Sequence, residues 1–140
     1  MRLAPTALIL AAALAVPAVR APAAETAEPM SAAAFDRYAT GKTLFYASDG
    51  HAYGAEQYLS GRRVIWTFLD GNCSEGVWYE SNGQICFRYD HDPEDPQCWS
   101  FFESGGGLMA QFENDPAQTE LIEVNQSREP LMCTGPDVGA

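Results

Sequence analysis

Four cysteines are the residues of this chain whose type and number most clearly indicate chemistry. They are Cys73, Cys86, Cys98 and Cys133. None belongs to a Cys-x-x-Cys pair, the spacing typical of zinc knuckles and thioredoxin-like redox sites. An even number of cysteines in a small exported domain instead predicts two disulfide bonds, for which the sequence allows three pairings.

Two histidines are the other residues that could do chemistry. His51 lies in a predicted turn near Asp49, where a histidine–carboxylate pair could act as acid and base. His91 lies in the acidic segment 90–95, but this segment lacks the ligand spacing of a calcium-binding EF-hand, and Pro93 favours a solvated turn. No Gly-x-Ser-x-Gly nucleophile motif is present. Enzyme activity is therefore not favoured, and we assign no catalytic residue, no metal ligand and no cofactor.

Aromatic side chains recur on nearly every predicted strand. In a small β-barrel, inward-facing positions either fill the core or line one ligand cavity. Core packing is the plainer interpretation, and a cavity for a small apolar ligand is the functional alternative. The residues assigned to the lining of such a cavity are Trp66, Trp78, Trp99 and Phe101.

The elements that must position these side chains are short strands separated by turn residues. We predict strands over 42–46, 56–59, 63–69, 76–80, 84–89, 97–102, 108–112 and 120–124. Asn82-Gly83 between two such runs is the strongest short hairpin signal. About eight strands at this spacing predict an all-β fold: an antiparallel, up-and-down, lipocalin-like barrel, whose closure removes its edge strands.

A short helix is predicted before the first strand. Ser31 can cap it, Phe35 and Tyr38 share one face, and the helix ends near Thr40 before Gly41. This helix could plug one end of the barrel.

The strand layout favours one disulfide pairing. If the strands 84–89 and 97–102 pair across the loop between them, Cys86 faces Cys98, as a bridge requires. Cys73 then remains for Cys133, and that bridge would pin the C-terminal tail. A Cys73–Cys86 bridge is less natural because the hairpin places Tyr79 opposite Cys86, although geometry does not exclude the other pairings.

The N-terminus has the pattern of a secretory signal peptide. Arg2 precedes an apolar run over 8–16, and small residues lead to Ala24. The run is shorter than the roughly 20 residues that cross a bilayer. We expect cleavage near Ala24, a linker over 25–30, one β-barrel domain over 31–140, and a periplasmic or secreted location.

The expected mature chain is strongly acidic. All 19 acidic residues follow Ala24, whereas two of the 8 basic residues, Arg2 and Arg20, precede it, so the mature net charge is −13. Such a chain repels nucleic acid and attracts cationic partners. We therefore expect no nucleic-acid partner. We also expect no membrane span, because no segment after the signal peptide could cross a bilayer.

Three stretches resemble small exported domains of Gram-negative bacteria, most of them of unassigned function. These are 76–79, 84–89 and 98–102, the last followed by Gly105-Gly106-Gly107. The resemblance implies a periplasmic location and supports a Cys86–Cys98 bridge, and it brings no catalytic residues. A looser likeness, through Gly76-x-Trp78, is to lipocalin-like barrels. Periplasmic inhibitors of lysozyme and proteases share the small disulfide-bearing barrel architecture alone.

These features together predict an exported, non-enzymatic β-barrel that binds a protein partner or a small apolar ligand in the cell envelope. One alternative is an acidic inhibitor of a cationic envelope hydrolase, a lysozyme or a protease, which electrostatic steering would favour. The other alternative is a hydrolase of unknown type that uses His51 or His91.

Overall fold

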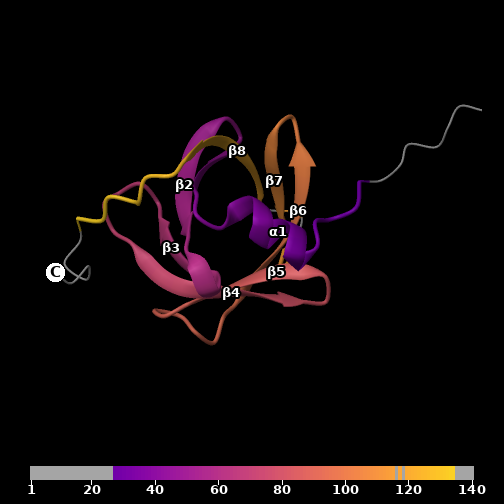
Figure 1. The fold of residues 1–140 in the computed structure, drawn as a ribbon, viewed down its shortest axis with the longest axis horizontal. Helices are drawn as coiled ribbons and strands as arrows, with labels where there is room; N and C mark the ends of the chain where they lie inside the picture. The colour runs from indigo at the N-terminus through magenta and orange to yellow at the C-terminus, as the bar shows by residue number, and fades with distance from the viewer. Residues whose placement is uncertain (1–26, 116, 118, 135–140) are drawn as a thin grey trace, which may run out of the picture.

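The structure is a computed structural model that describes residues 27–115, 117 and 119–134. The predicted signal peptide and its cleavage site lie outside these residues. The chain forms one α-helix, one short 3-10 helix and eight strands (Figure 1). Their bounds are α1 (Ala32–Ala39), β1 (Thr43–Ser48), β2 (His51–Tyr58), η1 (Ser60–Arg62), β3 (Arg63–Thr67), β4 (Ser74–Ser81), β5 (Gln84–Tyr89), β6 (Gln97–Ser104), β7 (Gly107–Phe112) and β8 (Glu120–Ser127).

The strands form one closed antiparallel barrel. Each strand pairs with the next along the chain, and β8 pairs with β1 to complete the ring. Figure 1 shows this ring of strands with α1 lying in its opening. The closed barrel and the short N-terminal helix confirm the predicted fold class. Closure leaves no unpaired sheet edge, which removes the main route by which β-proteins aggregate.

Successive connections lie at opposite ends of the barrel, because every pair of neighbouring strands is antiparallel. One end holds α1, η1 and the turns at 82–83 and 105–106, and we call it the plugged end. The other holds the β1–β2, β3–β4, β5–β6 and β7–β8 connections, and we call it the open end.

Helix α1 closes the plugged end through Phe35. The Ser31 side chain caps the helix by accepting a hydrogen bond from the Ala34 amide at 3.2 Å. Phe35 is completely buried, and its ring packs edge-on against Trp78, with 5.2 Å between the ring centroids. It lies 4.5 Å from the Phe101 ring by the same measure. The helix is therefore part of the hydrophobic core rather than an appendage to it.

The register between β5 and β6 is the one expected from the sequence. Cys86 faces Cys98, Ile85 faces Trp99, and Tyr79 of β4 faces Cys86 on its other side. The structure contains two disulfide bonds, Cys86–Cys98 and Cys73–Cys133.

The predicted start of the second strand is wrong. Strand β2 begins at His51 rather than at Glu56, so His51 belongs to a strand and not to a turn. The reason is the tightness of the β1–β2 connection. Asp49 and Gly50 both have positive φ, 48° and 76°, which makes a two-residue hairpin in which Ser48 pairs directly with His51.

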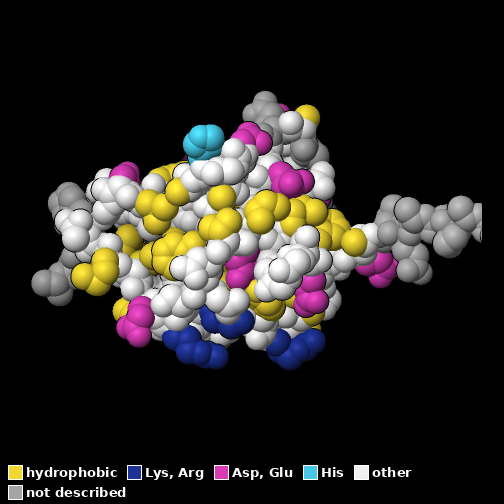
Figure 2. Space-filling view, turned by 90° about the horizontal axis from the view of Figure 1, so that it is seen from above, with side chains coloured by type: hydrophobic (Ala, Val, Ile, Leu, Met, Phe, Trp, Pro, Cys, Tyr) yellow, Lys and Arg dark blue, Asp and Glu magenta, His cyan; other side chains and the backbone are white. Residues whose placement is uncertain are grey.

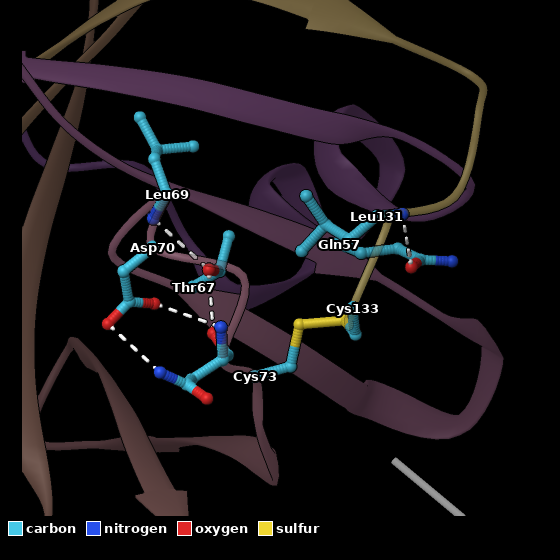
Figure 3. The surroundings of a disulfide bond; sticks show 8 residues. Gln57, Thr67, Leu69, Asp70, Cys73, Leu131 and Cys133 are labelled. Carbon is cyan, nitrogen blue, oxygen red and sulfur yellow. Dashed lines mark hydrogen bonds between the residues drawn. A yellow bond between two sulfur atoms is a disulfide. The ribbon is translucent and has the colours of Figure 1, made fainter. Parts of the chain in front are cut away.

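The C-terminal segment 128–134, which we call the strap, crosses the outside of the barrel. It leaves β8 and is held first to β1, where Thr43 Oγ1 donates to the Glu129 carbonyl at 2.8 Å. The Leu131 amide then donates to Gln57 Oε1 of β2 at 3.0 Å, and the Cys73–Cys133 bond ties the strap to the β3–β4 loop (Figure 3).

Candidate ligand-binding site in the barrel

A cavity of about 110 Å³ occupies the barrel interior toward the open end. Every strand contributes at least one side chain to the lining, since inward-facing residues alternate along each strand, and β4 does so only through Ser74 at its start. The lining residues are Tyr46, Tyr53, Glu56, Tyr58, Trp66, Phe68, Ser74, Phe87, Tyr89, His91, Gln97, Trp99, Phe101, Ala110 and Leu121.

Three aromatic side chains form one wall of the cavity. The ring centroids of Tyr53 and Trp66 lie 6.0 Å apart, and Phe68 meets Trp66 edge-on at 5.3 Å. Gly54 makes this wall possible, because a Cβ atom there would overlap the Trp66 ring. We call Tyr53, Trp66 and Phe68 the aromatic wall.

The β3–β4 loop holds Phe68 at the rim. Thr67 Oγ1 accepts a hydrogen bond from the Leu69 amide at 3.1 Å and donates one to the Asn72 carbonyl at 2.7 Å. Figure 3 shows these bonds beside the strap. They leave the Phe68 side chain 61% exposed at the mouth, an unusual position for a phenylalanine and one available to a ligand.

The floor of the cavity is polar. Glu56 is 98% removed from solvent, with 2% exposure, and its Oε2 accepts a hydrogen bond from the Tyr89 hydroxyl at 2.8 Å. Its other oxygen, Oε1, is buried and has no hydrogen-bond partner among the described residues. Tyr46 and Tyr58 form a second pair of groups, with their hydroxyl oxygens 3.0 Å apart.

Burial controls the ionisation of these groups. It raises the pKa of Glu56 to about 8, against the opposing effect of the Tyr89 hydrogen bond. Burial also raises the pKa of Tyr46, Tyr58 and Tyr89 well above the ordinary value, with the nearby Glu56 charge adding to the effect. At neutral pH the three hydroxyls are neutral, and Glu56 is the group on the floor that can gain a charge.

Three of the four side chains assigned to the cavity from the sequence line it, namely Trp66, Trp99 and Phe101. Trp78 does not. It lies under α1 against Phe35, and the Arg62 guanidinium stacks over its ring at 4.3 Å from the centroid. Its strand position faces inward as expected, but at the plugged end, where the helix already fills the interior.

Neither histidine hydrogen-bonds to a carboxylate among the described residues. His51 Nδ1 lies 2.9 Å from the backbone carbonyl of Asp49 and not from its carboxylate. His91 stacks on Tyr89 at the rim of the cavity, with 5.9 Å between ring centroids. In the part of the chain that the structure describes, no three His, Cys, Asp or Glu side chains converge as metal ligands.

Sequence reasoning missed Glu56, the most informative residue of the site. The signal was present in the alternation Glu56-x-Tyr58, which puts a carboxylate on the same face of a strand as a core tyrosine. The floor also depends on Tyr46 and Tyr89, which lie on β1 and β5. Their meeting with Glu56 follows from the closure and shear of the barrel, which strand patterns alone do not fix.

The rim of the cavity is acidic. The four connections at the open end contain eight carboxylates and no Lys or Arg. These carboxylates belong to Asp49, Asp70, Asp90, Asp92, Glu94, Asp95, Glu113 and Asp115. In Figure 2, Lys and Arg side chains gather at one end of the face that is drawn, and a histidine lies at the opposite end. The open-end connections thus carry negative charge alone, whereas the plugged end carries both signs.

A second hollow lies outside the barrel, between β1 and the strap. It has a volume of about 300 Å³ and is lined by Phe45, Leu69, Leu131 and Met132 among others. Of the two buried side-chain atoms without partners in the described residues, Glu56 Oε1 and Trp78 Nε1, neither belongs to this hollow. The smaller interior cavity is therefore the better candidate site, because a buried polar atom without a partner invites a ligand.

The fold and the site define a small closed β-barrel with a helix at one end and a cavity lined largely by aromatic side chains toward the other. No known protein family, curated protein or solved structure matches this chain. Among the described residues, no helix combines the length and apolar character needed to cross a membrane.

Proposed function

We propose that this protein binds a small ligand in the open end of its barrel and is not an enzyme. The observation that carries the proposal is Glu56 Oε1, a buried carboxyl oxygen without a hydrogen-bond partner among the described residues, at the floor of an aromatic cavity. A buried polar atom left unpaired costs about 1–3 kcal/mol. A ligand that supplies a hydrogen bond there would recover that free energy.

The size of the cavity limits the ligand. Pockets for drug-sized molecules are about 300–1,000 Å³. An apolar cavity of about 150 Å³ takes up one benzene molecule. The cavity of about 110 Å³ therefore suits a ligand with an apolar body of about one ring, the rest of which can extend past Phe68 at the mouth.

Filling the cavity tests this proposal. Ala110 lines the cavity and is 1% exposed, so Ala110→Leu places extra carbon atoms in the space that a ligand would occupy. We expect the variant to lose binding of benzyl alcohol, a neutral one-ring probe, as measured by quenching of tryptophan fluorescence. Ala33→Leu adds the same atoms on the exposed side of α1 and should bind like the parent. Equal binding by the parent and Ala110→Leu would exclude the interior cavity as the site.

We also propose that the protein acts outside the cytoplasm, after removal of residues 1–24, as one domain over 31–140. The two disulfide bonds support this location because they form and persist in oxidising compartments. N-terminal sequencing of protein recovered from the periplasm or the medium would test it, with a start near Glu25 expected. Recovery of the intact chain from the cytoplasm would contradict the proposal.

The acidic rim favours a second candidate function, inhibition of a cationic envelope hydrolase. Eight carboxylates around one end of a rigid barrel would steer a basic protein toward it. Assays with lysozymes and basic proteases at low and moderate salt would test this function. The absence of inhibition at micromolar concentrations of the protein would rule it out.

A further inference from the structure

The chemistry of the cavity narrows the class of ligand. We propose that the ligand is a small organic ammonium ion whose charged nitrogen pairs with Glu56 and whose apolar body lies against the aromatic wall. This inference rests on the proposed binding function and specifies it.

Once Glu56 is ionised, the floor of the cavity needs a hydrogen-bond donor. An ionised carboxylate only accepts hydrogen bonds, and Glu56 Oε1 has no partner among the described residues while Oε2 is already bonded to Tyr89. An ammonium group only donates hydrogen bonds, so it complements this oxygen. Lys and Arg are absent from the lining, and the one lining residue that can carry a positive charge, His91, lies nearer the mouth, where it stacks on Tyr89.

The wall of the cavity also favours a cation. Aromatic faces attract cations through their quadrupoles, and cages of aromatic rings are a common means of recognising ammonium groups. Trp66, the strongest ring for this interaction, and Tyr53 pack together beside the floor residue Glu56, which pairs with Trp66 across β2 and β3. The same rings would cover the apolar body of the ligand.

The acidic rim favours cationic ligands through longer-range electrostatic attraction. Its eight carboxylates create a negative potential at the mouth, which raises the local concentration of cations and repels anions. Three independent features, the unpaired carboxyl oxygen, the aromatic wall and the acidic rim, thus point to the same sign of ligand charge. The lining holds no Lys or Arg that would pair with a carboxylate or a phosphate.

Binding of an ammonium ion should release a proton. In the empty protein the pKa of Glu56 is about 8, so at pH 6.5 the carboxyl is protonated. When the ammonium ion binds, Glu56 gives its proton to solvent and the ligand keeps its own, so one proton leaves for each ligand bound. Affinity should therefore rise about tenfold per pH unit up to roughly pH 8 and then level off.

Other titratable groups face Glu56 from the strands around it. They are Tyr46 on β1, Tyr58 on β2 and Tyr89 on β5, with Tyr53 and His91 nearer the mouth. The three tyrosines of the floor stay neutral throughout the range from pH 5.5 to 8 because burial raises their pKa values. Histidine can change charge in this range, so the test must separate His91 from Glu56.

The experiment compares three probes of one shape and different charge: benzylamine, benzyl alcohol and benzoate. Calorimetric titration of the oxidised protein at pH 7.5 should give benzylamine an affinity about tenfold or more above that of benzyl alcohol, with no binding of benzoate. In Glu56→Gln the preference for benzylamine should disappear, while the affinity for benzyl alcohol stays within about twofold. Glu75→Gln removes an exposed carboxylate of β4 and should keep the preference.

The outcomes separate this inference from the function on which it rests. If benzyl alcohol binds as tightly as benzylamine, the barrel binds small ligands but the ammonium proposal is wrong. If none of the probes binds, the proposed function itself fails. A pH dependence of benzylamine affinity that persists in Glu56→Gln and vanishes in His91→Gln would also overturn the proposal. Release of one proton per benzylamine at pH 6.5, absent in Glu56→Gln, would support it.

Discussion

The buried carboxyl group of Glu56 lowers the free energy of unfolding of the barrel. Its carboxyl group is buried, bonded on one oxygen only, and the pKa is raised from 4.5 to about 8. Between these two pH values the unfolded chain loses the proton of Glu56 while the folded barrel retains it. Stability should therefore fall as pH rises from about 4.5 to about 8 and should change no further above that range. A glutamine of the same shape would avoid this penalty, which indicates a role for the carboxyl group other than folding.

Replacement of Glu56 by glutamine should flatten the pH dependence of stability. A pKa shift of this size corresponds to a ceiling of the order of 4 kcal/mol at pH 8. We expect Glu56→Gln to be more stable than the parent at pH 8, with the difference shrinking toward pH 4.5, in urea unfolding followed by circular dichroism. Glu75→Gln should parallel the parent at every pH. A constant difference between Glu56→Gln and the parent would show that the carboxyl is ionised in the folded protein.

Gly76 has a steric role that explains the Gly-x-Trp pattern of β4. A Cβ atom at Gly76 would collide with the Arg88 carbonyl oxygen and lie 2.9 Å from the Tyr89 Cα, both in the neighbouring strand β5. The absence of a side chain therefore lets β5 approach closely and places the Tyr89 ring, which bonds to Glu56, inside the barrel. Trp78, two residues further on, faces the same interior at the plugged end.

An alanine at Gly76 should therefore disturb both the packing and the site. We expect Gly76→Ala to lose about 1–3 kcal/mol of stability, because the collision is with backbone that cannot move away cheaply. Gly107→Ala provides the matched control, since its Cβ would meet Glu123 at an ordinary 3.4 Å. That variant should stay within about 0.5 kcal/mol of the parent in the same unfolding experiment. Similar losses in both variants would remove the steric explanation.

At the scale of elements, the positions and pairing of the strands could be predicted from the sequence, but the set of residues that meet inside the barrel could not. Period-2 runs between turn residues locate the strands, and pairing across the loop after Tyr89 sets Cys86 against Cys98 because both belong to one antiparallel register. The sequence does not indicate the early start of β2, because the segment 51–55 contains alanine and glycine rather than the β-branched residues typical of strands. Its pairing comes from the tight Asp49-Gly50 hairpin.

Whether an inward-facing residue lines the cavity depends on the end of the barrel near which it lies. Trp78 and Trp66 both point inward, but α1 occupies the end at which Trp78 lies, and so only Trp66 lines the cavity. Likewise, the meeting of Glu56 with Tyr89 joins residues 33 positions apart through the stagger of the closed barrel. Propensity and alternation are local properties, and neither contains the stagger.

One disulfide bond ties the strap to the β3–β4 loop, in addition to its hydrogen bonds to β1, β2 and Gly71. Cys73–Cys133 joins residues 60 apart, and closing a loop of this length contributes about 4 kcal/mol in the chain-entropy model. We expect the double variant Cys73→Ser, Cys133→Ser to lose stability of that order. Hydrogen exchange should show that the amides of Leu131 and Thr134 lose protection, while those of β5 keep theirs.

A control on the same segment is Met132→Ser, because Met132 is 83% exposed and its loss should leave the strap in place. Unchanged protection of Leu131 and Thr134 in the double variant would mean that the hydrogen bonds to Gln57 and Gly71 hold the strap without the bridge.

At the scale of the whole molecule, the charge is divided along the barrel axis. The acidic rim surrounds the open end, whereas Arg37, Lys42, Arg62 and Arg63 lie at the plugged end, the last of them as the first residue of β3, together with Asp36, which pairs with Arg62. Arg62 lies over the Trp78 ring, so part of this basic group also takes part in closing that end. A charged ligand approaching the molecule is thus guided toward the mouth or away from it according to its sign.

Neutralising part of the rim should slow the association of a cation without changing the aromatic wall or the floor of the cavity. The β5–β6 loop allows a clean variant, Asp92→Asn, Glu94→Gln, Asp95→Asn, because all three side chains are exposed. At low ionic strength we expect the association rate of benzylamine to fall by about three- to tenfold, a moderate steering effect. The difference should nearly vanish at 0.5 M salt, where screening acts within about 4–5 Å.

The decisive comparison is with a second triple variant that has the same net charge as the rim variant but keeps the rim intact. Glu28→Gln, Glu103→Gln, Glu129→Gln removes three exposed carboxylates that lie outside the four open-end connections, and it changes the net charge by the same amount. If steering comes from the rim, this variant should associate at close to the parent rate, because a screened potential depends on distance from the mouth. Equal slowing of both triple variants would show that only total charge matters, and the axial division of charge would then have no part in ligand capture.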